Sequence, residues 1–397
     1  MIVIELILLL YFLYVVFYTL IFSIAGVVRP YGIFTTPKSA SPSVAVIIPA
    51  YKEDTVIVSS AAKALHQGFP QKNYDVIIIA DSLRQETLLQ LRQLPVIVVE
   101  VSFDSSTKVK ALRAGIAALE RPYDIVVVLD ADNVMENDFL EKVSVTWRRG
   151  ILAIQGRRVA ANNNTHLAVL DGLSEILNNH IYRKGSSALG LSASLSGSAM
   201  AFDFPLFEET LRDMDSTGGF DRDMEVRLGM RGIKVFYLAE AIVYDEKVSR
   251  QEVFANQRKR WIASQYQYLG KYFATGIKAL FRRDFSLFNS SVLRNIQLPR
   301  VINIGLLGLI AVVSIPLQPW LNLSFYYWWI LLLLLGFAMI LAVPVSFYDR
   351  KFFQALGALP GTFFTMFTLL FRLKGANKQF IHTPHGEDQK ENISSQG

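Results

Sequence analysis

The stretch DIVVVLDADNVMENDFL, residues 124–140, decides what the rest of the chain can be. An apolar run from Ile125 to Leu129 is followed by two carboxylates, Asp130 and Asp132, with one alanine between them. Side chains two residues apart on a strand share a face, so we expect both carboxylates to lie near one point. Two negative charges that close repel each other unless something positive lies between them. The stretch therefore predicts a buried strand that ends at a charged site.

Further apolar runs precede this stretch and alternate with segments of helical periodicity. The runs are SVAVIIPA (43–50), YDVIIIADS (74–82) and LPVIVVEV (94–101), and the clearest helical segments are 54–67 and 107–120. Continuous apolar strands separated by helices indicate a parallel sheet with both faces covered. We therefore expect an α/β domain that binds its ligands at the carboxyl ends of the strands.

Charged side chains stand at several of these strand ends. Glu53 and Asp54 follow the first strand, Asp81 ends the second, and Lys108 opens a helix between the third and fourth. Carboxylates that hold a hard divalent cation suit, together with a nearby lysine, a diphosphate ligand. The pattern predicts Mg²⁺ or Mn²⁺ bound with a nucleoside diphosphate. The alternative is an aspartate-rich turn that only caps the next helix.

Several other classes of site are excluded. The first strand continues into PAYKED rather than a glycine fingerprint, and no GxxxxGK[ST] or HExxH sequence occurs, which argues against a dinucleotide fold, a P-loop and a zinc hydrolase. The chain has no cysteine, hence no disulfide or thiolate chemistry. Its formal charge is only +6, and the basic residues cluster beside apolar segments, so we expect no nucleic-acid partner.

Long apolar segments flank the predicted domain. Hydrophobic residues make up 52% of the chain, too many for an ordinary soluble domain of this length. Leu6–Val28 is uncharged and long enough to span a bilayer, and it lacks the basic start of a cleavable signal peptide. Val301–Phe347 predicts two spans joined by a short turn between Pro316 and Asn322. The chain is therefore expected to be a multi-pass membrane protein.

Two segments fit the membrane interface better than its interior. Arg283–Arg300 has apolar residues at helical spacing, which fits an interfacial helix or, alternatively, a core helix of the soluble domain. Phe352–Phe371 contains glycine and proline, and crossing would place basic residues outside, so we expect an interfacial or re-entrant segment. Because Arg29 and Lys38 follow the first span, the positive-inside rule places the α/β domain in the cytoplasm, at the plasma (inner) membrane.

These observations divide the chain into four parts. They are an N-terminal anchor and linker (1–40), a cytoplasmic α/β domain (41–280), interfacial helices with C-terminal spans (281–375) and a cytoplasmic tail (376–397).

At this point the motifs resemble those of one family. VAVIIPAYKED, ADS, STKVKAL, VLDAD, LSGSAM, GGFDRDMEVRL and NQRKRW occur in the order found in processive family 2 glycosyltransferases. Cellulose, hyaluronan and poly-N-acetylglucosamine synthases belong to that family, as do membrane-bound glycolipid synthases. The resemblance covers residues 44–261 and implies the GT-A fold, a mostly parallel sheet with flanking helices that binds a nucleotide-diphospho-sugar.

The resemblance assigns roles residue by residue. It implies a uridine pocket lined by Pro49, Tyr51, Glu53 and Asp81; a diphosphate region at Lys108, Asp130, Gln257 and Arg260; a metal ligand at Asp132; and an acceptor site at Trp261, Ser196 and Gly197. A tryptophan face offers apolar contact to a sugar, and an arginine fork suits phosphate oxygens. The tail sequence KQFIHTPHGED resembles the segment that places a threonine, here Thr383, over the donor.

The general base is assigned by alignment. Relatives carry a Thr-Glu-Asp-x-Glu-Leu motif, and here the matching stretch is FDRDMEV. Alignment on Glu225 places Asp223 at the base position and Arg222 where an acid is usual. Asp221, which directly follows the GGF turn, is the alternative.

Together these features predict an inverting transferase that moves a sugar from a UDP-sugar to a glycan or lipid-linked acceptor hydroxyl. In the predicted mechanism the base takes the proton as the acceptor attacks, and the metal with Arg260 stabilises the departing UDP. Membrane lipids, and a homo-oligomer or an export partner, are the expected partners. A polysaccharide synthase and a single-transfer glycolipid synthase both fit, and an inactive scaffold subunit and a transporter are the alternatives from other classes.

Overall fold

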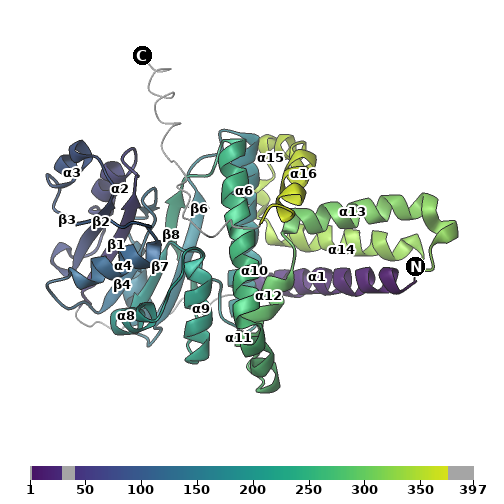
Figure 1. The fold of residues 1–397 in the computed structure, drawn as a ribbon, viewed down its shortest axis with the longest axis horizontal. Helices are drawn as coiled ribbons and strands as arrows, with labels where there is room; N and C mark the ends of the chain where they lie inside the picture. Colours follow the sequence, from purple (N-terminus) through teal and green to yellow (C-terminus); the bar gives the residue numbers. More distant parts are fainter. Residues whose placement is uncertain (1, 29–40, 374–397) are drawn as a thin grey trace, which may run out of the picture.

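The computed structural model describes residues 2–28 and 41–373 of the 397-residue chain (Figure 1). Arg29, Lys38 and Thr383, on which two of the expectations above depend, lie outside the described residues. The described part has an α/β domain on one side, an apolar helix bundle on the other, and a layer of helices between them (Figure 1).

One sheet runs through the α/β domain, and its strands have the order β3-β2-β1-β4-β7-β6-β8-β5. The strands are β1 (Val44–Tyr51), β2 (Tyr74–Asp81), β3 (Ile97–Val101), β4 (Ile125–Val128), β5 (Val134–Met135), β6 (Ala153–Ala160), β7 (Met200–Asp203) and β8 (Phe236–Asp245). The pairings among β3, β2, β1 and β4 are parallel, as the apolar runs predicted. The other half is mixed: β7 is antiparallel to β4 and β6, β5 is antiparallel to β8, and β6 is parallel to β8.

Helices cover both faces of the sheet because alternate residues of each strand point to opposite faces. In β1, Val46 and Ile48 pack in the core on one face, while Ala45 and Ile47 pack in the core on the other. The first face is covered mainly by α2 (Ile57–Ala64), α3 (Gln85–Leu91) and α5 (Phe139–Trp147), and the second by α4 (Lys108–Ala117), α8 (Phe204–Arg212) and α9 (Phe220–Met230). The strands are therefore buried on both faces.

A short 3-10 helix, η1 (Gln71–Asn73), precedes β2 inside the domain. The remaining helices of this domain contact the apolar helices, and they are α6 (His166–Asn178), the π-helix η2 (Asn179–Gly185) and α7 (Ser186–Ala188). The π-helix contacts α1, so the first apolar helix is packed directly against the α/β domain.

Within residues 2–28 and 41–373, three helices are long and apolar enough to cross a membrane: α1 (Ile2–Val28), α13 (Arg300–Leu317, continued by η4, Gln318–Trp320) and α14 (Phe325–Ala342). They lie side by side as a bundle (Figure 1). After η5 (Val345–Phe347), α15 (Arg350–Leu356) and α16 (Leu359–Leu370) form a pair bent by 50°, which fits a broken span or a re-entrant segment. The finding agrees with membrane association.

The helix α10 (Gln251–Phe281) lies across the end of this bundle rather than along it (Figure 1). After α10 comes the segment predicted as one helix from Arg283 to Arg300, which is broken into α11 (Phe285–Phe288), the π-helix η3 (Asn289–Leu293) and α12 (Arg294–Ile296). Its polar residues from Asn289 to Ser291 are buried, and η3 packs on α10. Part of this segment is thus a packed layer between the α/β domain and the bundle.

Glu5 ties the first span to the turn between the other two. α1 begins at Ile2, earlier than the uncharged stretch predicted, so Glu5 lies within the helix. Its buried carboxylate accepts hydrogen bonds from the backbone N–H groups of Asn322 (3.0 Å) and Leu323 (2.8 Å) and from the Asn322 side chain (2.9 Å). Three donors on one carboxylate make this a fixed contact between segments far apart in the sequence.

We expect Glu5→Ala to lower the unfolding temperature of the bundle, because it removes the acceptor of three hydrogen bonds between the first span and the turn at Asn322. The thermal unfolding of the detergent-solubilised chain measures this. Glu5→Gln keeps one acceptor oxygen and should lose less, and an unchanged unfolding temperature for Glu5→Ala would contradict the prediction.

Candidate active site

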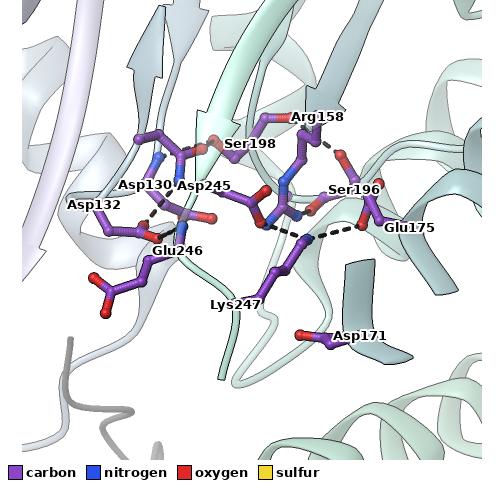
Figure 2. Close-up of polar contacts among 12 residues, drawn as sticks. Asp130, Asp132, Arg158, Asp171, Glu175, Ser196, Ser198, Asp245, Glu246 and Lys247 are labelled. Carbon is purple, nitrogen blue, oxygen red and sulfur yellow. Dashed lines mark hydrogen bonds and ion pairs between the residues drawn. The ribbon is translucent and has the colours of Figure 1, made fainter. Parts of the chain in front are cut away.

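The two aspartates of the opening stretch lie in a turn and not on a strand. β4 ends at Val128, and the N–H of Asn133 donates to the carbonyl of Asp130 (3.1 Å), which closes the turn. The expectation that Asp130 and Asp132 share a strand face was therefore wrong, because the i, i+2 rule holds only while the backbone stays extended. Each carboxylate instead has its own set of partners (Figure 2).

Asp130 is held by Lys108, the first residue of α4. The Lys108 ammonium forms an ion pair with the Asp130 carboxylate and also donates to the carbonyl of Gly197 (2.7 Å). The N–H of Asp130 donates to the hydroxyl of Ser198 (2.9 Å). The structure thus brings together Lys108, Asp130 and the Ser196–Ser198 loop, three parts of the predicted site that are distant in sequence.

Asp132 accepts a hydrogen bond from the side-chain amide of Asn133 (2.9 Å) and another from the backbone N–H of Glu246 (3.1 Å). An ionised carboxylate accepts only, and its oxygens are ligands that a hard divalent cation prefers. No cluster of three metal-ligating side chains occurs among residues 2–28 and 41–373. Mg²⁺ often binds through one or two carboxylates plus substrate phosphates, so the oxygen donors present fit such an ion.

A buried charge network lies next to the aspartates (Figure 2). Arg158 of β6 pairs with Asp245 at the end of β8, and Lys247 contacts both Asp245 (2.8 Å) and Glu175 of α6 (3.7 Å). Glu175 also pairs with Arg183 (2.6 Å). Burial lowers the pKa of Arg158, but the charges of Asp245 and Glu175 outweigh burial and raise it above its ordinary value.

This network fixes the loop that serves Asp132. Asp245 and Lys247 flank Glu246, whose N–H donates to the Asp132 carboxylate, so anchoring both neighbours holds that donor in place. Arg158 also donates to the carbonyl of Ser196 (3.1 Å). None of the network was predicted. Its members come from β6, α6 and the end of β8, and only pairing of distant segments brings them together.

The predicted uridine pocket lies at the ends of β1 and β2. Tyr51 and Asp81 are direct partners in the parallel register, and the N–H of Lys52 donates to the carbonyl of Asp81 (3.1 Å). Each strand is followed by a non-glycine residue in the left-handed conformation, Lys52 (φ 57°) after β1 and Ser82 (φ 57°) after β2. Such strained residues concentrate at functional sites.

The other members of this pocket differ in their surroundings. Pro49 is within β1 and opposite Ile79, while Glu53 and Asp81 are buried. The Asp81 carboxylate accepts from the Ser82 hydroxyl (2.9 Å). Asp54, in contrast, accepts from Thr87 (2.6 Å) and from the N–H of Arg84 (2.8 Å), so it holds the loop after β2 in place.

The Ser196–Ser198 loop is shaped by its backbone. Gly197 (φ 81°) and Ala199 (φ 53°) both adopt left-handed conformations. The buried Gln155 side chain accepts from the N–H of Ser196 (3.0 Å) and donates to the carbonyl of Ser198 (3.0 Å), which braces the loop from below. This bracing presents the Gly197 carbonyl to Lys108.

The first turns of α10 carry Gln257, Arg260 and Trp261. Gln257 has a buried side-chain oxygen without a hydrogen-bond partner among the described residues, and Arg260 is partly buried. Trp261 is 41% exposed, and its ring stacks on the Arg258 guanidinium, 4.3 Å from ring centroid to Cζ. Arg258 is in turn paired with Asp171 of α6. Sequence reasoning missed Arg258 and Asp171, although Arg258 lies inside the same motif.

The two candidate bases at the start of α9 lie in different surroundings. Asp223 is fully buried, and its carboxylate accepts from Ser216 (2.6 Å), Tyr272, Arg227 (3.1 Å) and Lys271 (3.1 Å). Burial raises the pKa of Asp223, and these hydrogen bonds and charges outweigh it, so its pKa lies below the ordinary value. A carboxylate in this position is a weak proton acceptor.

Asp221 is closer in sequence to the part of α9 that touches the site. Phe220, its neighbour, lies under the Lys108 ammonium at 5.2 Å from the ring centroid. Asp221 itself is half-buried in the first turn of the helix. Lys271, which holds Asp223, is eleven residues beyond Arg260 in α10, a rise of about 16 Å. The Asp223 carboxylate is thus held at the level of Lys271 and Tyr272 in α10.

Comparison with known proteins identifies a family and several similar proteins. Residues 42–264 match the model of the family described as "Glycosyltransferase like family 2", which is more than half of the chain. "Probable glucomannan 4-beta-mannosyltransferase 9" of Oryza sativa subsp. japonica is 24% identical over 276 residues, which cover 65% of this chain and 52% of that protein. "Beta-monoglucosyldiacylglycerol synthase" of Trichormus variabilis is 24% identical over 250 residues, 58% and 50% of the two chains. The matched region thus spans about half of these relatives.

Among solved structures, the mannosyltransferase PcManGT from Pyrobaculum calidifontis, in complex with GDP-Man and Mn²⁺, is similar with a TM-score of 0.52. The similarity covers 86% of this chain and 98% of that one at 14% sequence identity, and it concerns the fold.

Proposed function

Since the chain belongs to glycosyltransferase family 2, we propose that it transfers a sugar from a UDP-sugar to a hydroxyl of a glycan or lipid-linked acceptor. We place the reaction at the cytoplasmic face of the plasma (inner) membrane, with inversion at the anomeric carbon. The predicted GT-A fold and the glycosyltransferase class are confirmed by the family match and the similar fold. The donor, the stereochemistry and the membrane face are the proposal.

One arrangement carries the proposal: Lys108, Asp130, Asp132 and the Ser196–Ser198 loop lie together at the carboxyl edge of the sheet. In this proposal Lys108, together with Arg260 as the family resemblance implies, would provide positive charge for a diphosphate, and Asp132 would hold a divalent cation. Such a cation supplies charge neutralisation for a departing nucleoside diphosphate. The solved relative binds GDP-Man with Mn²⁺, which supports metal use by this fold.

The transfer itself needs one displacement. The acceptor oxygen bonds to the anomeric carbon, the bond from that carbon to the phosphate oxygen breaks, and its electron pair leaves with UDP. The acceptor proton passes to a carboxylate at the start of α9. Alignment assigns this role to Asp223, while the four donors that occupy the Asp223 carboxylate favour Asp221.

A single-transfer glycolipid synthase is the second candidate, and one observation favours it. The described residues contain three helices that could span a membrane, or four if the bent pair counts, which leaves little material for a polymer channel within one chain. The relatives include both a glucomannan mannosyltransferase and a glucosyldiacylglycerol synthase, so their names support either product.

The test is an assay of the full chain in nanodiscs with Mn²⁺ or Mg²⁺ and a panel of UDP-sugars, with GDP-mannose included. We expect release of nucleoside diphosphate from one UDP-sugar, and the size and organic solubility of the labelled product separate polymer from glycolipid. Turnover only with GDP-mannose would contradict the donor assignment. No turnover with any donor would support the inactive-scaffold reading.

Trp261 offers a separate prediction about the acceptor. Asp171→Ala removes the partner of Arg258, and Arg258 then no longer fixes the tryptophan ring. A cation–π contact contributes about 0.5–2 kcal/mol, so we expect the KM for the acceptor to rise about fivefold. The KM for the donor should stay within twofold of the wild type, a factor that matches about 0.4 kcal/mol.

Two variants complete this test. Asp171→Asn keeps an acceptor oxygen for Arg258 and should fall between the wild type and Asp171→Ala. Equal increases in both KM values would show that the pair only supports folding, and would contradict the positioning of Trp261.

A further inference from the structure

The turn between α10 and α11, residues 278–285, carries exposed side chains that the transfer reaction does not use. Phe281 is 84% exposed and Phe285 is 56% exposed, and Lys278, Arg282 and Arg283 are exposed beside them. No carboxylate of the described residues forms an ion pair with any of these three cations. Exposed aromatic rings beside unpaired basic groups are typical of segments at a membrane surface.

The backbone of this turn favours a role for its side chains. The N–H of Asp284 donates to the carbonyl of Ala279 (2.9 Å) and that of Arg283 to Leu280 (3.0 Å), the pattern that ends a helix at a left-handed residue. Arg283 occupies that left-handed position (φ 62°), where glycine is usual and strain-free. An arginine retained in a strained conformation points to a function for its guanidinium.

The acidic residue of the turn does not neutralise these cations. Asp284 is half-buried, and its carboxylate caps α11 by accepting from the N–H of Leu287 (3.0 Å). Lys278, Arg282 and Arg283 therefore present net positive charge.

The position of the turn indicates what the charge meets. α10 lies across the end of the bundle formed by α1, α13 and α14, and the turn is at the C-terminal end of α10 (Figure 1). From there, the segment Phe285–Ile296 leads directly to Arg300, where α13 begins. The turn is thus at the level where the apolar helices begin.

We propose that this turn binds the headgroup phosphates of anionic phospholipids through Arg282, Arg283 and Lys278, while Phe281 and Phe285 enter the apolar boundary. The charge of such a surface is complementary to the turn, and each basic residue near it contributes to binding. The contact would fix α10, which carries Gln257, Arg260 and Trp261, at a set height over the bilayer. The inference holds whichever sugar the chain transfers.

The first test uses the absence of cysteine from the chain. A nitroxide attached to Phe281→Cys in nanodiscs of phosphatidylcholine and phosphatidylglycerol should be more accessible to oxygen than to a water-soluble nickel complex. A label at Lys72→Cys, on an exposed position of the α/β domain, is the matched control and should show the reverse. An aqueous environment at both positions would overturn the proposal.

The second test separates lipid recognition from folding. Arg283→Gly removes a charge but also relieves the left-handed strain, so its unfolding temperature should not fall. The preference of bound lipid for phosphatidylglycerol over phosphatidylcholine should fall about fivefold for Arg283→Gly and as much again for Arg282→Gln. Arg282→Lys should retain the preference. An apolar environment at residue 281 with unchanged lipid preference in the arginine variants would exclude an anionic-headgroup site.

Discussion

Replacing Asp132 with asparagine is expected to lower turnover by about 10²–10³-fold, the usual cost of removing one group that stabilises charge in a transition state. The substitution keeps the size of the side chain and removes its charge. One oxygen of the Asp132 carboxylate accepts from the Asn133 side chain and the other from the N–H of Glu246. The substitution replaces one of these oxygens by an NH₂ group, which cannot accept a hydrogen bond. Turnover is measured as nucleoside diphosphate released per chain, at saturating donor and acceptor.

The metal dependence makes this prediction specific to Asp132. The variant should need a much higher Mn²⁺ concentration for half-maximal donor binding, whereas a general loss of folding would leave that concentration unchanged. Asp138→Asn is the matched control. Asp138 directly precedes α5, and its exposed carboxylate forms an ion pair with Lys142 of the same helix. If Asp132→Asn had the turnover and the metal dependence of the wild type, Asp132 would not be a metal ligand.

Periodicity and motif order predicted the parts of the fold that local sequence controls. The apolar runs became the parallel strands β3, β2, β1 and β4, because a strand buried on both faces must be apolar at every position. The apolar helices α1, α13 and α14 were also predicted, because the thickness of a bilayer sets how long an apolar segment must be to cross it. The mixed half of the sheet was not predicted, because the composition of the short strands β5 and β7 does not show the direction in which they run.

The candidate site also has a part that the sequence predicted and a part that it did not. Lys108, Asp130 and the Ser196–Ser198 loop were singled out by motifs, and the structure brings them into contact. The pairs of Arg158 with Asp245 and of Arg258 with Asp171 could not be predicted, because each joins residues more than 80 positions apart. Sequence patterns show which residue types are present, but only tertiary packing decides which charges neutralise each other.

The choice between Asp221 and Asp223 is the second large expected effect. If Asp221 accepts the acceptor proton, Asp221→Asn should lower turnover by about 10²–10⁴-fold, the contribution of a positioned general base. Donor affinity and the unfolding temperature should stay close to the wild type, since Asp221 is half-buried in the first turn of α9. Asp221→Glu, which keeps a carboxylate, should recover part of the turnover. Full turnover of Asp221→Asn would return the role to Asp223.

Asp223→Asn should act on stability instead. Its carboxylate joins α9 to α10 through Arg227, Lys271 and Tyr272, so we expect a loss of about 2–3 kcal/mol in the free energy of unfolding. Because the pKa of Asp223 is lowered in the folded chain, this stabilisation is present above the ordinary pKa and disappears as the pH falls through the lowered value. The difference in unfolding temperature between wild type and Asp223→Asn should therefore be full at neutral pH and shrink in acid. A pH-independent difference, together with a loss of turnover as large as that of Asp221→Asn, would mean that Asp223 leaves these partners to act as the base.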